Sequence, residues 1–240
     1  EEKLQCARDC GYDFVEISID ESDARLARLE WTAQERAQLR ETMQKIGVPI
    51  RSMCLSGHRK YPFGASDPAV RRRSLDIMAK AIQLADDLGI RIIQLAGYDV
   101  YYEPSSAETR RHFAENLQAA VTMAAVHGVI LGVETMETEF MNTVTKSMVY
   151  VDQIRSPYLG VYPDVGNLTN AATTYGTSVQ DDMETGRGHL VAIHLKETVP
   201  GKFREIPFLT GHVDFPAVIR KGWQLGVRRF VTEMWDTGKP

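Results

Sequence analysis

The chain has 240 residues, of which 43% are hydrophobic and 25% charged, and its formal net charge is -4. This length and composition are typical of one large globular domain or two small ones. The acidic balance argues against a nucleic-acid partner, because binding to a phosphate backbone requires a basic surface. The sequence has no uncharged apolar run of about 18 residues, so we expect no membrane span and no membrane partner.

The cysteines are Cys6, Cys10 and Cys54, an odd number without a CxxC motif. Disulfides and zinc sites normally use paired cysteines at characteristic spacings. The pattern therefore predicts buried free thiols and a reducing, cytoplasmic compartment.

Four amphipathic helices are predicted in chain order, each beginning at a capping residue and ending at a glycine. They run from Thr32 to Gly47, from Asp67 to Gly89, from Ser105 to Gly128 and from Asp214 to Gly226. Glu35 follows Thr32, and Glu108 follows Ser105, at the capping-box spacing of three residues. Pro68 suits the first helical position after Asp67.

Short apolar runs between these helices predict seven strands, at about residues 14–19, 49–55, 91–96, 129–134, 159–163, 190–195 and 228–233. Alternating helices and strands favour a parallel sheet covered by helices. We therefore predict one domain over residues 1–240, a (β/α)8 TIM barrel of the α/β class. An open, doubly wound seven-stranded sheet is the alternative. A full barrel requires a strand before residue 1 and a helix after residue 240, so we expect its first strand and last helix to be missing from this chain.

Four strands in the second half end at a residue that can bind a metal: Glu134, Asp164, His194 and Glu233. In a parallel barrel all strands end around one mouth, so these side chains would converge. Any one of them alone could be a helix cap, a salt-bridge partner or a core histidine. Four in successive strands predict a shared site for a divalent ion, and their oxygen-rich donor set suits Mn, Zn, Co or Mg.

Polar residues near these strand ends are candidates for substrate contacts, because barrel enzymes bind substrates at this edge. Glu137, Asn167 and Lys196 follow three of the predicted ligands, and we expect Val165-Gly166 to form a flexible turn. His58 and Arg59 follow an earlier strand and suit hydroxyl or phosphate recognition, although Arg59-Lys60 as a solvated basic loop is the alternative. The motifs GxGxxG, GxxxxGK[ST], GxSxG and HExxH are absent from the sequence.

Taken together, these segments resemble the sugar phosphate isomerase/epimerase superfamily, which shares the xylose-isomerase-like barrel. Within it, the chain is most similar to the L-ribulose-5-phosphate 3-epimerase (L-xylulose-5-phosphate 3-epimerase) family of bacterial ascorbate and pentose use. The stretches that carry the resemblance are 12–16 (YDFVE), 52–59 (SMCLSGHR), 93–102 (IQLAGYDVYY), 162–168 (YPDVGNL), 188–194 (GHLVAIH) and 233–235 (EMW).

The sequence departs from the family pattern in one loop. Residues 207–215 resemble a segment that usually reads PFGEGxVDF, but Leu209, Thr210 and His212 replace the residues expected there, with loss of a glycine and a carboxylate. Glu197 occupies a position where aspartate is commoner. Because this loop lies beside the expected mouth, the departures leave the exact sugar phosphate open.

The resemblance implies a metal-dependent 3-epimerase of a ketopentose phosphate, acting as a cytoplasmic homodimer. Glu134 and Glu233 come from different sides of the mouth, so we expect them to transfer the protons. Asp164 and His194 would then bind only the metal. The open alternatives are an aldose–ketose isomerase, a hexulose (phosphate) 3-epimerase and a non-catalytic sugar-binding protein. A DNA-repair endonuclease of the related barrel class is disfavoured, because its several metals require many histidines and this chain has six.

Overall fold

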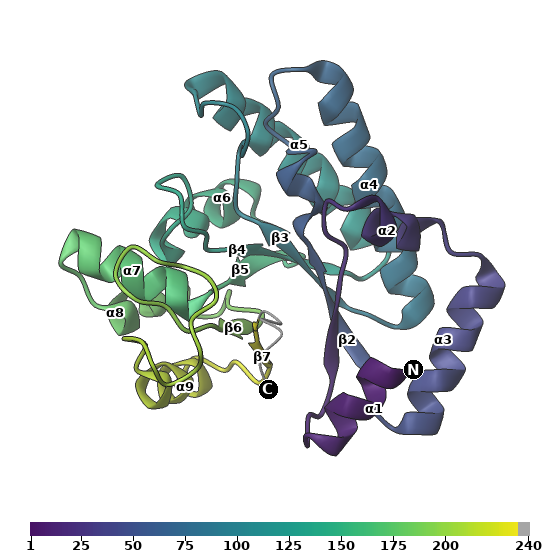
Figure 1. Ribbon diagram of the computed structural model, residues 1–240. Helices are drawn as coiled ribbons and strands as arrows, with labels where there is room; N and C mark the ends of the chain where they lie inside the picture. The colour runs from purple at the N-terminus through teal and green to yellow at the C-terminus, as the bar shows by residue number, and fades with distance from the viewer. Residues whose placement is uncertain (235–240) are drawn as a thin grey trace. The chain divides into compact units, whose positions relative to one another are not determined.

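The structure, a computed structural model, describes residues 1–234. The chain divides into two compact units, Glu1–Leu131 and Gly132–Pro240. In both units strands alternate with helices along the chain, as Figure 1 shows by colour from purple to yellow. All seven predicted strands are present. No helix among the described residues is long and apolar enough to cross a bilayer.

The first unit contains three complete parallel strands and the helices that follow them. Its elements are α1 (Glu2–Asp9), β1 (Val15–Ser18), α2 (Asp23–Leu26), η1 (Ala27–Glu30), α3 (Ala33–Ile46), β2 (Ile50–Leu55), η2 (Ser56–Arg59), α4 (Pro68–Leu88), β3 (Ile92–Ala96) and α5 (Ala107–Val126). β1 pairs with β2, and β2 pairs with β3, in parallel register. β4 (Ile130–Glu134) begins in this unit, where the Ile130 amide donates to the Arg91 carbonyl at 2.9 Å.

The helix starts follow the predicted capping residues with one exception, and the helices that start near Ser105 and at Asp214 end at His127 and Leu225, one residue before the predicted glycines. Thr32 and Glu35 form a reciprocal capping box on α3, and Asp67 caps α4 ahead of Pro68. α5, however, begins one residue later than predicted, because Ser106 forms the capping box with Thr109. The Ser105 hydroxyl instead donates to Asp99 at 2.7 Å.

The cysteine prediction is correct for bonding and wrong for burial. All three cysteines are free thiols, but Cys6 and Cys10 are exposed on α1 and Cys54 is half-buried. Leu4 is the buried residue of this short helix, so its remaining faces contact solvent.

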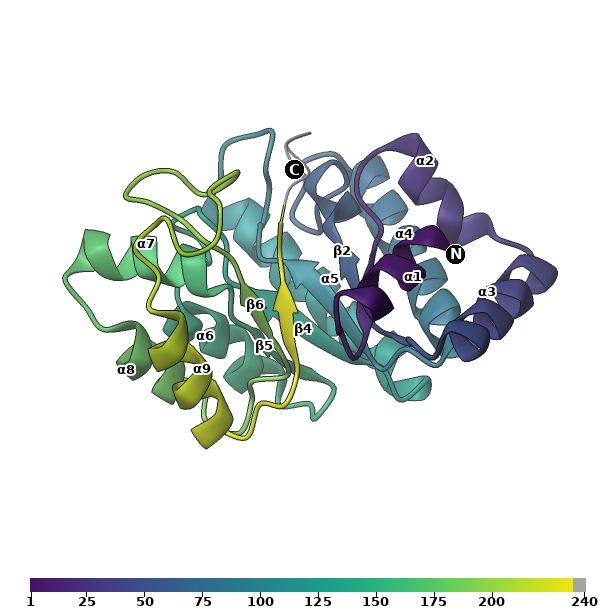
Figure 2. The ribbon, with the colours of Figure 1, turned by 60° about the horizontal axis from the view of Figure 1, so that its bottom comes forward.

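The second unit contains the later strands and three helices that the capping pattern did not predict. Its elements after β4 are α6 (Val144–Ile154), β5 (Leu159–Tyr162), α7 (Val165–Tyr175), α8 (Val179–Thr185), β6 (Ile193–Leu195), α9 (Phe215–Gln224) and β7 (Phe230–Thr232). Figure 2 shows α8 beside α9, and these two helices are in contact.

Parallel pairing continues through the second unit and aligns the strand ends. The Thr135 amide, just after β4, donates to the Tyr162 carbonyl of β5 at 3.3 Å. Beyond β5, Asp164 bridges in parallel to His194, and β6 pairs with β7 along its whole length. Successive strands of this unit therefore bring their carboxyl ends to a common edge.

Candidate metal centre and active site

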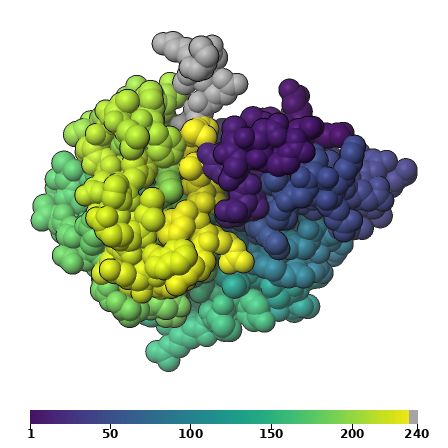
Figure 3. All heavy atoms as spheres, turned by 90° about the horizontal axis from the view of Figure 1, so that it is seen from below, coloured from purple at the N-terminus to yellow at the C-terminus, as the bar shows by residue number. Residues whose placement is uncertain are grey.

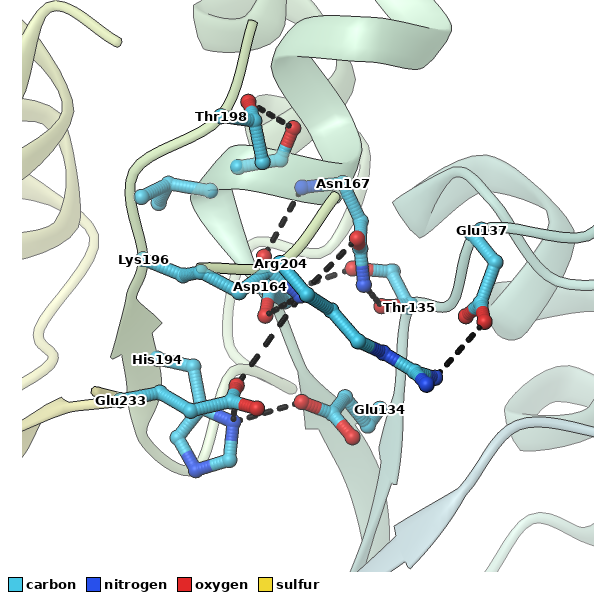
Figure 4. Close-up of polar contacts among 12 residues, drawn as sticks. Glu134, Thr135, Glu137, Asp164, Asn167, His194, Lys196, Thr198, Arg204 and Glu233 are labelled. Carbon is cyan, nitrogen blue, oxygen red and sulfur yellow. Dashed lines mark hydrogen bonds and ion pairs between the residues drawn. The ribbon is translucent and has the colours of Figure 1, made fainter. Parts of the chain in front are cut away.

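The second unit brings together the four predicted metal ligands. Glu134 is the last residue of β4, Asp164 follows β5, His194 lies within β6, and Glu233 follows β7. One ligand atom from each residue lies within 4.8 Å of the others. Figure 4 shows these side chains converging from their separate strands. The predicted strand ends thus lie close enough together to bind one ion.

His194 is the centre of this cluster. Its Nδ1 atom lies 2.5 Å from Glu134 Oε1 and 3.4 Å from Glu233 Oε2. The ring packs against Tyr162 with a centroid distance of 4.6 Å, and the residue is only 2% exposed. Packing on Tyr162 therefore orients Nδ1 towards the carboxylates.

Asp164 has two roles, because it also begins a helix. Its Oδ1 atom accepts the Asn167 amide at 2.8 Å, which makes Asp164 the N-cap of α7. The predicted flexible turn at Val165-Gly166 is therefore wrong, since these residues form the first turn of α7. Glycine is required at 166, because an added Cβ would lie 2.8 Å from the Lys196 carbonyl oxygen.

Lys196 supplies a buried cation to the cluster. Its Nζ atom lies 2.7 Å from Asp164 Oδ2 and donates to Asn167 Oδ1 at 3.0 Å. The Asn167 amide group in turn donates to the Thr135 carbonyl at 2.8 Å, and the Thr135 hydroxyl accepts the Asp164 amide at 2.9 Å. This network fixes the position of Asp164 from both sides of its carboxylate.

The pKa values show how strongly these charges interact. Burial raises the pKa of Glu134, and it raises the pKa of Asp164 to about 7 against the opposing charge of Lys196. Burial also acts to raise the pKa of Glu233, but Lys196 and His194 outweigh it and hold that pKa at about 2. Two buried carboxylates and the half-buried carboxylate of Glu233 outnumber the one ammonium, and a divalent cation would neutralise their excess negative charge.

The donor atoms fit such a cation. Asp164 Oδ2 and Glu233 Oε2 are buried atoms, and their contacts are with Lys196 Nζ at 2.7 Å and His194 Nδ1 at 3.4 Å. Each oxygen keeps a lone pair that a bound cation could use, and binding an ion lowers the cost of burying charged oxygens. With an imidazole nitrogen and a third carboxylate, the set suits a divalent metal, as predicted.

The predicted substrate residues fall into two groups. Glu137, Asn167 and Lys196 lie in the second unit with the four ligands, and Glu137 Oε1 accepts Arg204 Nη2 at 3.0 Å. The first unit contains His58 and Arg59. Trp235, the last residue of the EMW stretch, lies outside the described residues.

His58 and Arg59 have well-defined surroundings within the first unit. His58 is 4% exposed, its Nε2 donates to the Ser74 carbonyl at 3.2 Å, and its ring packs on Phe63. The Arg59 guanidinium lies 5.1 Å from the Tyr101 ring centroid. Lys60 is exposed and Arg59 is half-buried, so the solvated basic loop stays open for these two residues, and a substrate contact by His58 or Arg59 stays a prediction.

Sequence reasoning missed two residues that contact the predicted ones. Arg204 lies in the loop between β6 and α9, and Thr135 follows Glu134 directly. No local sequence pattern indicates Arg204, because it lies in an irregular loop 67 residues from its partner Glu137. Thr135 could have been suspected from its place beside a ligand at the end of a strand.

Comparison with known proteins identifies the family. Residues 4–238 match the xylose isomerase-like TIM barrel family. The chain belongs to this family. It is 49% identical to the putative L-ribulose-5-phosphate 3-epimerase SgbU of Escherichia coli (strain K12), over 98% of this chain and 83% of that protein. It is 45% identical to the L-ribulose-5-phosphate 3-epimerase UlaE of Shigella boydii serotype 18, over 98% of this chain and 82% of that protein.

Solved structures support the same fold within this family. The apo form of the 3-keto-D-glucoside 4-epimerase YcjR from E. coli has a TM-score of 0.78 and 16% identity, over 100% of this chain and 88% of that one. An L-ribulose 3-epimerase has a TM-score of 0.73 and 18% identity, over 99% of this chain and 77% of that one. The predicted TIM barrel and family are confirmed, as is the isomerase class of carbohydrate epimerase.

Proposed function

We propose that this chain is a metal-dependent 3-epimerase of a ketopentose phosphate, either L-ribulose 5-phosphate or L-xylulose 5-phosphate. The observation that carries the proposal is the convergence of Glu134, Asp164, His194 and Glu233 within 4.8 Å. The names of the two similar proteins, both L-ribulose-5-phosphate 3-epimerases, support the substrate class. A role in cytoplasmic pentose or ascorbate catabolism, as a homodimer, fits this substrate.

Epimerisation at C3 requires one proton to leave the carbon and another to arrive on the opposite face. Glu134 and Glu233 come from β4 and from the end of β7, and both carboxylates reach the His194 ring. One carboxylate would take the proton from C3, and the other would return a proton to the opposite face. A bound divalent cation would stabilise the negative charge that develops on the adjacent oxygen.

The remaining residues would hold the substrate and the ligands. Asp164 and His194 would bind the metal without transferring protons. Asn167 and Lys196 contact Asp164, and their amide and ammonium groups would also donate to a substrate hydroxyl. Glu137 and its partner Arg204 are part-exposed, with side-chain exposures of 21% and 40%, so they remain accessible to a hydroxyl or phosphate. His58 and Arg59 are the further candidates from the first unit.

Exchange of the C3 proton with solvent deuterium tests this proposal. Positioned acid–base groups contribute roughly 10²–10⁴-fold each, so Glu134→Gln and Glu233→Gln should each reduce exchange by that factor. Metal content should be measured in both variants to separate proton transfer from metal loss. Glu139→Gln, the same change at an exposed position after β4, is the matched control and should exchange at the wild-type rate.

Two results would contradict the proposal. Undiminished exchange in both glutamine variants would exclude proton transfer by these carboxylates. Exchange at C1 with release of an aldose phosphate would instead favour the isomerase alternative. A panel of pentulose and hexulose substrates, with and without phosphate, would separate the ketopentose phosphate from a hexulose substrate.

A further inference from the structure

Atoms of the long segment between β6 and α9, coloured yellow-green, lie at the surface of the second unit (Figure 3). Its two ends meet, because the His212 amide donates to the Thr198 carbonyl at 3.0 Å. His212 Nε2 also lies 3.0 Å from the Thr198 hydroxyl, which donates to the Gly166 carbonyl. Residues 199–211 thus form an Ω-loop, a compact loop whose ends lie together.

Glu197 holds the base of this loop. The residue is only 2% exposed, and its carboxylate accepts three backbone amides. Oε1 accepts Thr198 N at 3.0 Å and Val213 N at 3.2 Å, and Oε2 accepts Leu209 N at 3.0 Å. Hydrogen bonds to an ionised carboxylate are stronger than those between neutral groups. One side chain therefore joins the start of the loop to two points near its end.

The backbone around Glu197 is adapted to this contact. A Cβ at Gly211 would lie 2.0 Å from the Thr198 carbonyl oxygen and 2.4 Å from Glu197 Oε1. Leu209 has a φ of 65°, in the left-handed region that non-glycine residues seldom occupy. Such a conformation persists only where its surroundings hold it, and the bond from Leu209 N to Glu197 does so.

The anchored loop carries Arg204 to the neighbourhood of the metal ligands. Gly201 N donates to Asn170 Oδ1 on α7 at 2.8 Å, which fixes one side of the loop. Arg204 Nη2 then contacts Glu137 at 3.0 Å, three residues beyond Glu134 (Figure 4). The segment has no helix or strand of its own, and its local backbone pairing is the antiparallel bridge between Val199 and Lys202, two residues before Arg204.

We propose that Glu197 is a positioning residue for substrate binding: by holding the base of the 199–211 loop it fixes Arg204 beside Glu137. The substrate named in this proposal rests on the proposed function. The anchoring of the 199–211 loop by Glu197 does not depend on that function. Glu197 acts through the loop and not through the metal, so its loss should weaken substrate binding while leaving metal affinity unchanged.

Glu197→Gln is the decisive variant, because it keeps the size of the side chain and removes its charge. Glu205→Gln makes the same change at an exposed position of the same loop and serves as the control. Three quantities are compared with wild type: amide hydrogen exchange across residues 199–213, the dissociation constant of Mn²⁺, and kcat and KM for L-ribulose 5-phosphate.

Loss of one charge-assisted hydrogen bond corresponds to about a tenfold change in an equilibrium constant. We therefore expect Glu197→Gln to raise loop exchange and KM about tenfold, with kcat reduced less and Mn²⁺ affinity within about twofold of wild type. Glu205→Gln should change none of these. If Glu197→Gln does not fold, Gly211→Ala disturbs the same contact while keeping the carboxylate, and it should raise loop exchange and KM in the same way.

Unchanged loop exchange in Glu197→Gln would overturn the anchoring role. Faster exchange with an unchanged KM would overturn the link to substrate binding, and a parallel loss of Mn²⁺ affinity would show action through the metal ligands instead. If wild type turns over no ketopentose phosphate, the proposed function fails, and the exchange comparison still decides whether Glu197 anchors the loop.

Discussion

Lys196 Nζ lies 2.7 Å from Asp164 Oδ2, and the two side chains are 6% and 0% exposed. A buried charge left without its partner is strongly destabilising, whereas removal of both charges is much less so. Lys196→Met should therefore lower the free energy of unfolding by about 3–5 kcal/mol, measured by urea denaturation of the metal-free protein.

The double variant Lys196→Met/Asp164→Asn is the control for this prediction. It removes the carboxylate that the single variant leaves unpaired, so it should recover part of the lost stability. Additive losses in the double variant would show that the two side chains do not stabilise one another.

Metal binding should stabilise the folded chain through the four converging ligands. At a free ion concentration of a hundred times Kd, binding to the folded state alone adds about 2.7 kcal/mol to the free energy of unfolding. Thermal unfolding with MnCl₂ and with a chelator measures this difference. His194→Asn should remove it, while His189→Asn, which changes an exposed histidine nearby, should retain it. An equal metal effect in both variants would place the ion elsewhere.

The strand ends could be predicted from sequence because their signal is local and repeated. Each apolar run stops at one polar residue, and parallel topology alone requires such residues to share an edge. The helix caps at Thr32 and Asp67 are local in the same way, and both were predicted correctly. At Ser105 the neighbouring Ser106 offered an equivalent cap, and a contact with Asp99 decided between them.

The contacts that escaped prediction join residues far apart in the chain. Asp164 was predicted as a ligand. The sequence did not indicate that it also caps α7, whose first turn contains Val165-Gly166 in place of the predicted flexible turn. Arg204 and Glu137 are 67 residues apart, and no periodic pattern connects them. The burial of His58 depends on Ser74 and Phe63, which its polar sequence neighbourhood does not indicate.

His58 should make stability depend on pH under mildly acidic conditions. Burial lowers the pKa of His58 from 6.5 to about 4, partly opposed by the hydrogen bond to the Ser74 carbonyl. Between these values the unfolded chain binds the proton and the folded chain does not. The contribution is therefore fully present above pH 6.5 and is lost as the pH falls towards 4, by about 3 kcal/mol in total.

Urea denaturation of wild type and His58→Gln across this pH range measures the contribution. The variant cannot titrate, so its free energy of unfolding should fall less steeply than that of wild type as the pH decreases. His189→Gln removes an exposed histidine and should keep the wild-type slope. Identical slopes for wild type and His58→Gln would contradict the prediction.

Asp182 caps a helix to which it does not belong. Its carboxylate accepts Val144 N at 2.7 Å and Thr145 N at 3.1 Å, at the start of α6, and also the Thr145 hydroxyl at 2.8 Å. A negative charge at a helix N-terminus is stabilised by unpaired amides and by the helix dipole. Asp182→Ala should therefore lower the free energy of unfolding, measured by urea denaturation, by about 1–2 kcal/mol, and Asp182→Asn by less.

Asp181→Ala is the control for this prediction. It removes the adjacent, exposed carboxylate and should have little effect in the same urea denaturation measurement. Equal losses for Asp181→Ala and Asp182→Ala would mean that the general charge of α8, and not the cap on α6, is responsible.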